Sequence, residues 1–231
     1  MKIAAIMQPT YLPWVGYFNL MAMADVFVFF DDQRFTPRSW HHRNKIIVDG
    51  KEQWLSIPVK GGRDQRLCDC VVDDSQPWRE KHVAAIRRTY GGMAAGSEVA
   101  RIVDTCLTET HCSNLSNLNK SITLAIAERM GIKPLWFSAS TMVFPGSHLG
   151  TKSGRAIDLC KGLGCDTLYN ASGAREFVEA EGLFAADGID VVYQEIPAHW
   201  PQISIVDVIA RHGFDYAAQL AFNREPSEQM V

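Results

Sequence analysis

Chemically useful side chains gather near the N-terminus, in the stretch "MQPTYLPWVGY" at residues 7–17. Gln8 carries an amide that both donates and accepts hydrogen bonds, and Tyr11 and Tyr17 carry phenolic hydroxyls. Trp14 adds a large flat face. Sugars and nucleotides need stacking plus a few directed hydrogen bonds, so we expect these four side chains to line a ligand pocket. The alternative is that Trp14 and Tyr17 are core residues of the following helix.

Two adjacent carboxylates, Asp31 and Asp32, follow the apolar run at residues 26–30. Paired carboxylates at the end of a strand can hold a metal, orient an amine or act as a general base. An amine must lose a proton before or during attack on a carbonyl, so a catalytic carboxylate is chemically sensible. The alternative is that one of them caps the next turn or pairs with Arg34 or Arg38. We expect one of the two to belong to the catalytic site.

A basic and aromatic block follows, with four substrate-binding candidates: Arg38, Trp40, Arg43 and Asn44. Arginine binds phosphate or carboxylate through two parallel hydrogen bonds. A nucleotide diphosphate, or the phosphate of a phosphopantetheine arm, is therefore a fitting ligand for this block. The alternative is a solvated loop whose arginines pair with the aspartates.

The same block contains two adjacent histidines, His41 and His42. Either can act as an acid or a base near neutral pH. Adjacent residues of an extended segment point in opposite directions, so at most one of them faces the site. We take His41 as the catalytic candidate, against the alternative that it lies on the surface.

Three further polar residues stand near predicted helix starts: Ser153, Arg155 and Ser172. The first turn of a helix has free backbone N–H groups that bind anions, so we expect these residues to contact substrate. The alternative for the serines is simple helix capping.

The elements that position these residues alternate between strand and helix. Residues 3–7 form an apolar run, an open loop with two prolines follows, and residues 15–23 have helical spacing before the second apolar run. The later chain repeats the rhythm, with strands in 132–140, 165–172 and 189–196 and helices in 151–164, 173–188 and 204–213. This pattern predicts an α/β fold with a mostly parallel central sheet flanked by helices.

An insert interrupts this rhythm between residues 33 and 73. It is predicted to be a polar loop plus an antiparallel β-hairpin, because Asp49-Gly50 between two β-type runs favours a type I′ turn. Helices are predicted at 75–91, 101–110 and 115–130. We expect one α/β domain over residues 1–231, with a flexible tail at 221–231.

Composition narrows the classes of function. The net charge of −3 over 231 residues argues against a nucleic-acid-binding protein. The apolar runs are too short or too interrupted for a signal peptide or a membrane span, so a cytoplasmic protein is expected. The six cysteines fit buried, reduced thiols, and no metal site is predicted.

The sequence lacks the motifs of a covalent nucleophile. It contains neither a G-x-S-x-G elbow nor a Walker loop, and its cysteines lie in or beside apolar runs. Direct attack of an acceptor amine on an activated acyl donor needs only the positioning of both.

Several blocks resemble the WbqC-like protein family. Within residues 8–58 these are "MQPTYLPWVGYF", "ADVFVFFDDQRF", "RSWHHRNKI" and "WLSIPV"; later ones are "DLCKGLGCDTLYNASGAREFV", "LFAADGIDVVYQ" and "SIVDVIARHG". The resemblance covers most of the chain. Two departures are a short loop before "SIVD", where acceptor contacts would lie, and the doubled histidine.

The resemblance implies a bacterial enzyme of surface-polysaccharide (O-antigen) or specialised-metabolite biosynthesis. The implied activity is transfer of an acyl or aminoacyl group, such as glycyl, to an amine such as that of a nucleotide-linked amino sugar. A phosphopantetheine-linked donor, on a carrier protein or as coenzyme A, fits this reaction.

The first thirty residues are also similar in layout to nucleotidylyltransferases of the HIGH type. The histidines of that motif are missing, since Trp14 and Tyr17 occupy the region. This similarity gives one alternative to the transferase, an ATP-dependent nucleotidyltransferase or ligase. A separate alternative is a non-catalytic partner of a carrier protein or glycosyltransferase.

Overall fold

The computed structural model describes residues 1–62, 64–109, 112–144 and 150–223. Its centre is a five-stranded, all-parallel sheet with the order β7-β2-β1-β8-β9. The strands are β1 (Ile3–Met7), β2 (Val26–Phe29), β7 (Leu135–Ser138), β8 (Thr167–Asn170) and β9 (Asp190–Tyr193). The predicted fold class, a parallel sheet flanked by helices with a separate antiparallel hairpin, is confirmed.

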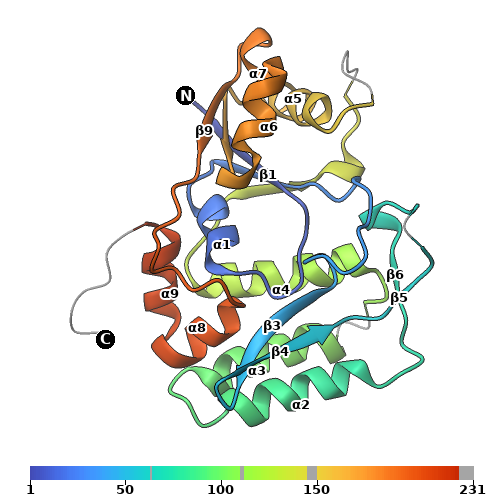
Figure 1. Ribbon diagram of the computed structural model, residues 1–231, viewed down its shortest axis with the longest axis vertical. Coiled ribbons are helices and arrows are strands. Elements are labelled where there is room, and N and C mark those ends of the chain that lie inside the picture. Colours follow the sequence, from blue (N-terminus) through green and yellow to red (C-terminus); the bar gives the residue numbers. More distant parts are fainter. Residues whose placement is uncertain (63, 110–111, 145–149, 224–231) are drawn as a thin grey trace.

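Helices cover both faces of the sheet (Figure 1). One face packs against α5 (Lys152–Gly162), α6 (Arg175–Glu181) and α7 (Leu183–Ala186). The other face packs against a thicker layer, which consists of α1 (Val15–Ala22), α2 (Trp78–Tyr90), α3 (Gly96–Asp104), α4 (Leu115–Arg129), α8 (Ile205–His212) and α9 (Phe214–Ala221).

Strand β2 lies inside the sheet, between β7 and β1, and it is apolar and buried at every position. Val26 and Val28 pack into the thinner layer, and Phe27 and Phe29 pack into the thicker one. A strand buried on both faces needs no polar alternation, which is typical of parallel sheets.

The insert forms the hairpin of β3 (Arg43–Val48) and β4 (Lys51–Ser56), and β3 contacts α2 and α8. Asp49 and Gly50 both have positive φ, at 50° and 74°, as the predicted type I′ turn requires. A second small pair joins β5 (Val59–Lys60) to β6 (Val71–Val72).

Several predicted boundaries differ from the structure, and the helix predicted at 173–188 is divided at Gly182 into α6 and α7. The predicted helix at 101–110 is α3, which starts at Gly96 and leads into one turn of π-helix at Thr105–Glu109. The tail predicted from residue 221 starts too early, because Ala221 ends α9 and is fully buried. Residues 224–231 lie outside the described part of the chain.

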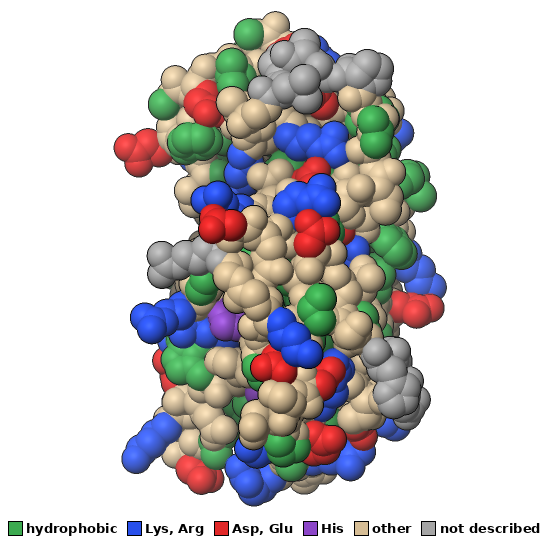
Figure 2. Space-filling view, turned by 90° about the vertical axis from the view of Figure 1, so that its right-hand side faces the viewer, with side chains coloured by type: hydrophobic (Ala, Val, Ile, Leu, Met, Phe, Trp, Pro, Cys, Tyr) green, Lys and Arg blue, Asp and Glu red, His purple; other side chains and the backbone are tan. Residues whose placement is uncertain are grey.

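Charge is mixed over the surface. On the face shown in Figure 2, Lys and Arg side chains are interspersed with Asp and Glu side chains. Among the helices of the described residues, none is both long enough and apolar enough to cross a membrane.

Candidate functional site

A cavity of about 520 Å³ lies at the carboxyl end of β1. Ligands of open α/β sheets bind at this end of the strands. The walls come from the loop after β1, the start of α1, the loop before β3 and the segment before α8. The lining residues are Met7, Gln8, Thr10, Pro13, Trp14, Tyr17, Thr36, Ser39, Trp40, His41, Asn44 and Gln202.

The loop after β1 is held in place by two of the predicted site residues. Tyr11 is fully buried, and its hydroxyl makes a 2.9 Å hydrogen bond with Nδ1 of His82 on α2. Asn44 lines the cavity, but its Nδ2 donates to the carbonyls of Tyr11 and Leu12, at 3.1 and 2.6 Å. Tyr11 is not a lining residue, so these contacts assign both residues to shaping the loop.

Trp14 forms one wall of the cavity at the start of α1. Its ring lies so close over Gly16 that a Cβ there would approach Cζ2 of Trp14 to 2.2 Å. The indole also meets the ring of Trp200 edge-on, with ring centroids 6.4 Å apart. Gly16 and Trp200 together fix the position of the indole.

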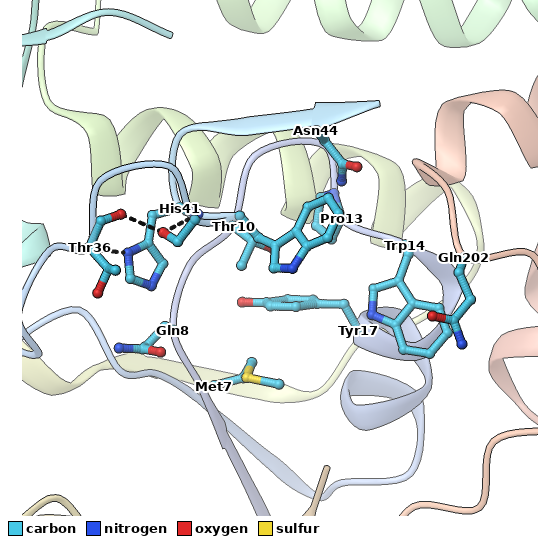
Figure 3. A pocket seen from close by; sticks show the side chains of 12 residues that line it. Met7, Gln8, Thr10, Pro13, Trp14, Tyr17, Thr36, His41, Asn44 and Gln202 are labelled. Carbon is cyan, nitrogen blue, oxygen red and sulfur yellow. Dashed lines mark hydrogen bonds between the residues drawn. The ribbon is translucent and has the colours of Figure 1, made fainter. Parts of the chain in front are cut away.

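Tyr17 lines the cavity and carries an unpaired hydroxyl. Its side chain is buried, and its hydroxyl has no hydrogen-bond partner among the described residues. In Figure 3 its ring crosses the middle of the cavity, and the hydroxyl points toward the side of Gln8 and His41. Burial, and secondarily the Asp31 carboxylate, raise the pKa of Tyr17, so the hydroxyl stays protonated as a donor.

His41 offers a second donor to the same space. Its Nδ1 accepts a 3.2 Å hydrogen bond from the backbone N–H of Thr36 (Figure 3), which assigns the ring proton to Nε2. Burial, followed by the charges of His42 and Lys152, lowers the pKa of His41 to about 4. The ring is therefore neutral at pH 7, and it is a hydrogen-bond donor rather than an effective base.

The ring of His42 lies between two backbone groups, unlike the ring of His41. Its Nε2 accepts from the backbone N–H of Arg38 at 2.9 Å, and its Nδ1 lies 2.9 Å from the carbonyl of Ile57. His42 thus joins the loop to the end of the hairpin. Of the two histidines, His41 is the one that lines the cavity.

The two predicted catalytic carboxylates lie outside the lining of this cavity. Asp31 is fully buried and pairs with Lys120 on α4 at 2.9 Å. It also accepts from Ser116, from the hydroxyl of Ser140 and from the backbone N–H of Ser140, at 3.3, 3.0 and 2.8 Å. These contacts tie the end of β2 to α4 and to the segment after β7.

Asp32 pairs with Arg155 instead. The Nε of Arg155 lies 2.8 Å from Asp32, and its NH2 group donates to the carbonyls of Ala139 and Met142, both at 2.7 Å. Through these contacts Arg155 joins α5 to the end of β2 and to the segment after β7. The catalytic role of a carboxylate stays a prediction, and the described lining of the 520 Å³ cavity includes no Asp or Glu.

The basic and aromatic block divides between the cavity and the surface. Trp40 lines the cavity and packs on Trp54 of β4, with ring centroids 5.5 Å apart. The guanidinium of Arg43 lies 4.2 Å from the Trp54 ring centroid. Arg38 is exposed, with a positive φ of 61°, and neither arginine lines the cavity.

Arg155 lines, together with Asp32, a separate cavity of about 320 Å³. Another of the residues predicted at the helix starts lines a smaller cavity of about 220 Å³, the second cavity. Ser153 lines it, while Ser172 stands between two lining residues, Ala171 and Gly173, without lining it. Met7 and Gln8 line both cavities, so the two adjoin at the end of β1.

Sequence reasoning missed several lining residues. Gln202 comes from a segment that the bridge between Trp14 and Ser204 brings beside α1, and no local pattern announces that contact. Thr36 and Ser39 line the cavity as loop residues between the aspartates and the histidines. Lys152 precedes the predicted Ser153, and its place beside a helix start was the signal that could have found it.

The large cavity is uncharged over its described lining. Its described lining includes no Lys, Arg, Asp or Glu, and His41 is neutral. The described residues also bring no three His, Cys, Asp or Glu side chains together as a metal site. The arrangement can bind an uncharged polar group between two hydrogen-bond donors and several aromatic rings.

Comparison with known proteins places the chain in a family. The model of the WbqC-like protein family matches residues 8–218. The chain belongs to the WbqC-like protein family. Except for Met7, all residues that line the large cavity fall within the match to the WbqC-like model.

A relative aligns with nearly the whole length of the chain. It is an uncharacterized protein of Mycobacterium tuberculosis, 29% identical over 237 residues, and the alignment covers 97% of this chain and all of the relative. No solved structure matches significantly.

Proposed function

We propose that the protein transfers an acyl or aminoacyl group from an activated donor to the amino group of an acceptor. The observation that carries the proposal is the buried, unpaired hydroxyl of Tyr17, a residue that lines the same cavity as the neutral ring of His41. A buried donor without a partner is costly, and a carbonyl oxygen of the substrate would supply the missing acceptor.

The two donors suit the chemistry of acyl transfer. When the amine nitrogen attacks the carbonyl carbon, the C–N bond forms and the carbonyl electron pair moves to oxygen. The hydroxyl of Tyr17 and Nε2–H of His41 would stabilise this developing oxyanion. When the tetrahedral intermediate collapses, the bond to the leaving group breaks. For a thioester donor the departing thiolate takes the proton that the nitrogen releases.

The absence of charged side chains from the described lining also suits an amine nucleophile. Burial away from water disfavours a charged ammonium and lowers its pKa, so a larger fraction of the bound amine is neutral. The side-chain carbonyl of Gln8, which has no partner among the described residues, can accept a hydrogen bond from that amine. In this proposal no carboxylate is needed as a base.

The thiols of the chain offer no competing covalent route. None of the six cysteines forms a disulfide, and none lines the large cavity. Burial raises the pKa of both Cys70 and Cys160 to about 12, which keeps these thiols protonated and weakly nucleophilic. We therefore propose direct transfer, without an acyl-enzyme.

Membership of the WbqC-like family supports the choice of substrates. The family resemblance implies amine acceptors such as nucleotide-linked amino sugars, and phosphopantetheine-linked donors. We propose that the aromatic walls formed by Trp14 and Trp40 hold the flat or sugar-like part of the acceptor.

The sheet order favours one competing function. The strand order reverses between β1 and β8, which is where nucleotides bind in many open parallel sheets. A nucleotidyltransferase or ligase would therefore use the same place in the fold. It would consume ATP and release pyrophosphate, whereas direct transfer from a thioester does neither.

A product screen tests the proposal. The purified protein would be incubated with acyl- and glycyl-thioesters of coenzyme A and pantetheine, together with nucleotide-linked amino sugars, with and without ATP. Mass spectrometry would detect amide products, and a phosphate assay would detect pyrophosphate. Amide formation without ATP supports the proposal. Amide formation that requires ATP, or pyrophosphate release without an amide, would contradict it.

A further inference from the structure

The second cavity lies at the reversal point of the sheet, between the ends of β1 and β8. Its deeper wall is apolar, with Leu168 of β8, Ala156 of α5 and Phe184 of α7. Its polar wall is formed by the start of α5. This cavity differs from the large one because a charged side chain, Lys152, lines it.

The start of α5 presents unsatisfied donors to this cavity. The side chain of Thr151 caps the helix by accepting from the N–H of Gly154 at 3.0 Å. The N–H groups of Lys152 and Ser153 precede the first intrahelical hydrogen bond and have no helical acceptor. The 11-residue helix also places the positive end of its dipole here.

Two side chains beside this helix start are unpaired within the described structure. Ser153 is only 5% exposed, yet its hydroxyl makes no hydrogen bond with the described residues. Lys152 makes no ion pair with them, and no Asp or Glu stands among the described lining residues. The Oδ1 of Asn170 accepts from the N–H of Ala171 at 3.0 Å, which leaves its Nδ2 for a ligand.

We propose that this second cavity binds a phosphoryl group, and that the substrate of the transfer reaction carries it. The donors of this cavity are an ammonium, a hydroxyl, an amide and two backbone N–H groups. Together they offer more hydrogen bonds than the two oxygens of a carboxylate accept. The three terminal oxygens of a phosphoryl group match this set better.

The shared residues connect this group with the reacting carbonyl. Because Met7 and Gln8 line both cavities, one substrate can place its phosphoryl group beside Lys152 and its reactive end near Tyr17. The second half of this inference rests on the proposed function, whereas the phosphoryl site itself does not.

Binding of inorganic phosphate and pyrophosphate tests the site without turnover. Thermal-shift and ³¹P NMR titrations would compare the wild type with Lys152→Gln and Ser153→Ala, at constant ionic strength. Lys81→Gln is the matched control, because Lys81 is an exposed lysine in the first turn of another helix, α2. Acetate is the control anion.

We expect saturable binding of both phosphates to the wild type and to Lys81→Gln. Binding should weaken about tenfold in Lys152→Gln and several-fold in Ser153→Ala. Unchanged affinity in Lys152→Gln, an equal loss in Lys81→Gln, or acetate binding as strong as phosphate would overturn the inference.

The two proposals fail separately in these experiments. Phosphate binding that depends on Lys152, in a protein that forms no amide, would refute the transferase and keep the phosphoryl site. Amide formation by a protein that does not bind phosphate, and at an unchanged rate in Lys152→Gln, would refute the phosphoryl site and keep the transferase.

Discussion

At the scale of single residues, the site depends on two hydrogen-bond donors that the fold leaves unused. The hydroxyl of Tyr17 is buried without a partner, and His41 keeps its proton on Nε2 because Thr36 occupies Nδ1. A fold selected only for stability would remove or pair the hydroxyl of Tyr17. Because Tyr17 lines the cavity and keeps this unpaired hydroxyl, we assign the hydroxyl to the binding of a ligand.

Tyr17→Phe separates stability from function. The substitution removes a buried, unsatisfied hydroxyl, so the free energy of unfolding should stay the same or rise by about 1 kcal/mol. Transfer should fall about 100-fold, as for the loss of one oxyanion donor. Urea denaturation and product formation would measure the two effects. Tyr193→Phe is the matched control, because the hydroxyl of Tyr193 is also buried and unpaired but does not line the large cavity.

Gly16→Ala tests the wall formed by Trp14. The added methyl would meet the indole at 2.2 Å, so the ring must move from its place against Trp200. We expect weaker ligand binding, by about tenfold, with helix α1 retained. Gly92→Ala is the control, since nothing lies within 4 Å of its added Cβ. Calorimetric titration with the substrate found in the screen would measure the affinities, and equal affinities in the two variants would contradict this role of Trp14.

Only some of these residues could be predicted from the sequence. Gln8, Trp14, Tyr17, Trp40 and His41 were predicted as site residues and line the large cavity. Tyr11 was predicted with them, but it turns toward His82, which is 71 positions away in the chain. Residue types in an irregular loop indicate a site, but they do not tell which side chains point inward, because distant partners decide that.

At the scale of elements, the cavity is held by polar contacts between segments. The buried pair of Asp31 and Lys120 connects β2 with α4, and Asn119 of α4 donates to the carbonyl of His41 at 2.7 Å. The positions of Asp31 and α4 therefore influence the placement of His41. The sequence indicated the carboxylate but not its partner, since Lys120 lies 89 positions further along.

Asp31→Asn tests the anchoring role. Breaking a buried ion pair by neutralising one partner leaves Lys120 unpaired and should lower the free energy of unfolding by about 3–5 kcal/mol. Asp64→Asn removes an exposed pair with Arg34, at 3.2 Å, and should change stability by less than about 0.5 kcal/mol. Urea denaturation measures both. A variant Asp31→Asn with wild-type stability but without transfer would instead favour Asp31 as a base.

The buried histidines give the fold a defined pH dependence. Burial lowers the pKa of His82 to about 4, as it does for His41. The unfolded chain binds protons near pH 6.5, whereas the folded chain binds them near pH 4. The free energy of unfolding should therefore have its full value above about pH 7 and fall between pH 6.5 and 4. The loss should be up to about 2 kcal/mol per histidine at pH 5.

Histidine variants isolate this effect from the carboxylates. Urea denaturation at pH 7.5 and 5.0 should show a smaller loss of stability for His82→Gln than for the wild type. His199→Gln replaces an exposed histidine and should keep the wild-type difference. If all three proteins lost the same stability, the buried neutral state of His82 would be contradicted.

At the scale of the whole molecule, two hydrophobic cores share one sheet. Alternate residues of β1 and β2 enter the thinner and the thicker layer, so neither core is complete without these strands. The apolar runs of the sequence were sufficient to predict the parallel sheet. The helix α9 was missed, because its role appears only in three dimensions, where it packs against α1 and α8.

The shared sheet predicts cooperative unfolding. Loss of one helical layer would expose a face of β1 and β2, so the two layers should unfold together. Tryptophan fluorescence reports Trp78 and Trp200, both buried in the thicker layer, and far-ultraviolet circular dichroism reports all helices. We expect the two urea transitions to coincide. Clearly separated transitions would mean that the layers form independent folding units.

The role of this cavity in acyl transfer is tested most sharply by the rate of amide formation by Tyr17→Phe relative to the wild type. It would be measured by mass spectrometry with the donor and acceptor found in the screen, at equal concentrations of folded protein. We expect a rate about 100-fold lower in a variant that is at least as stable as the wild type. Amide formation at the wild-type rate would contradict the assignment of this cavity as the site of acyl transfer.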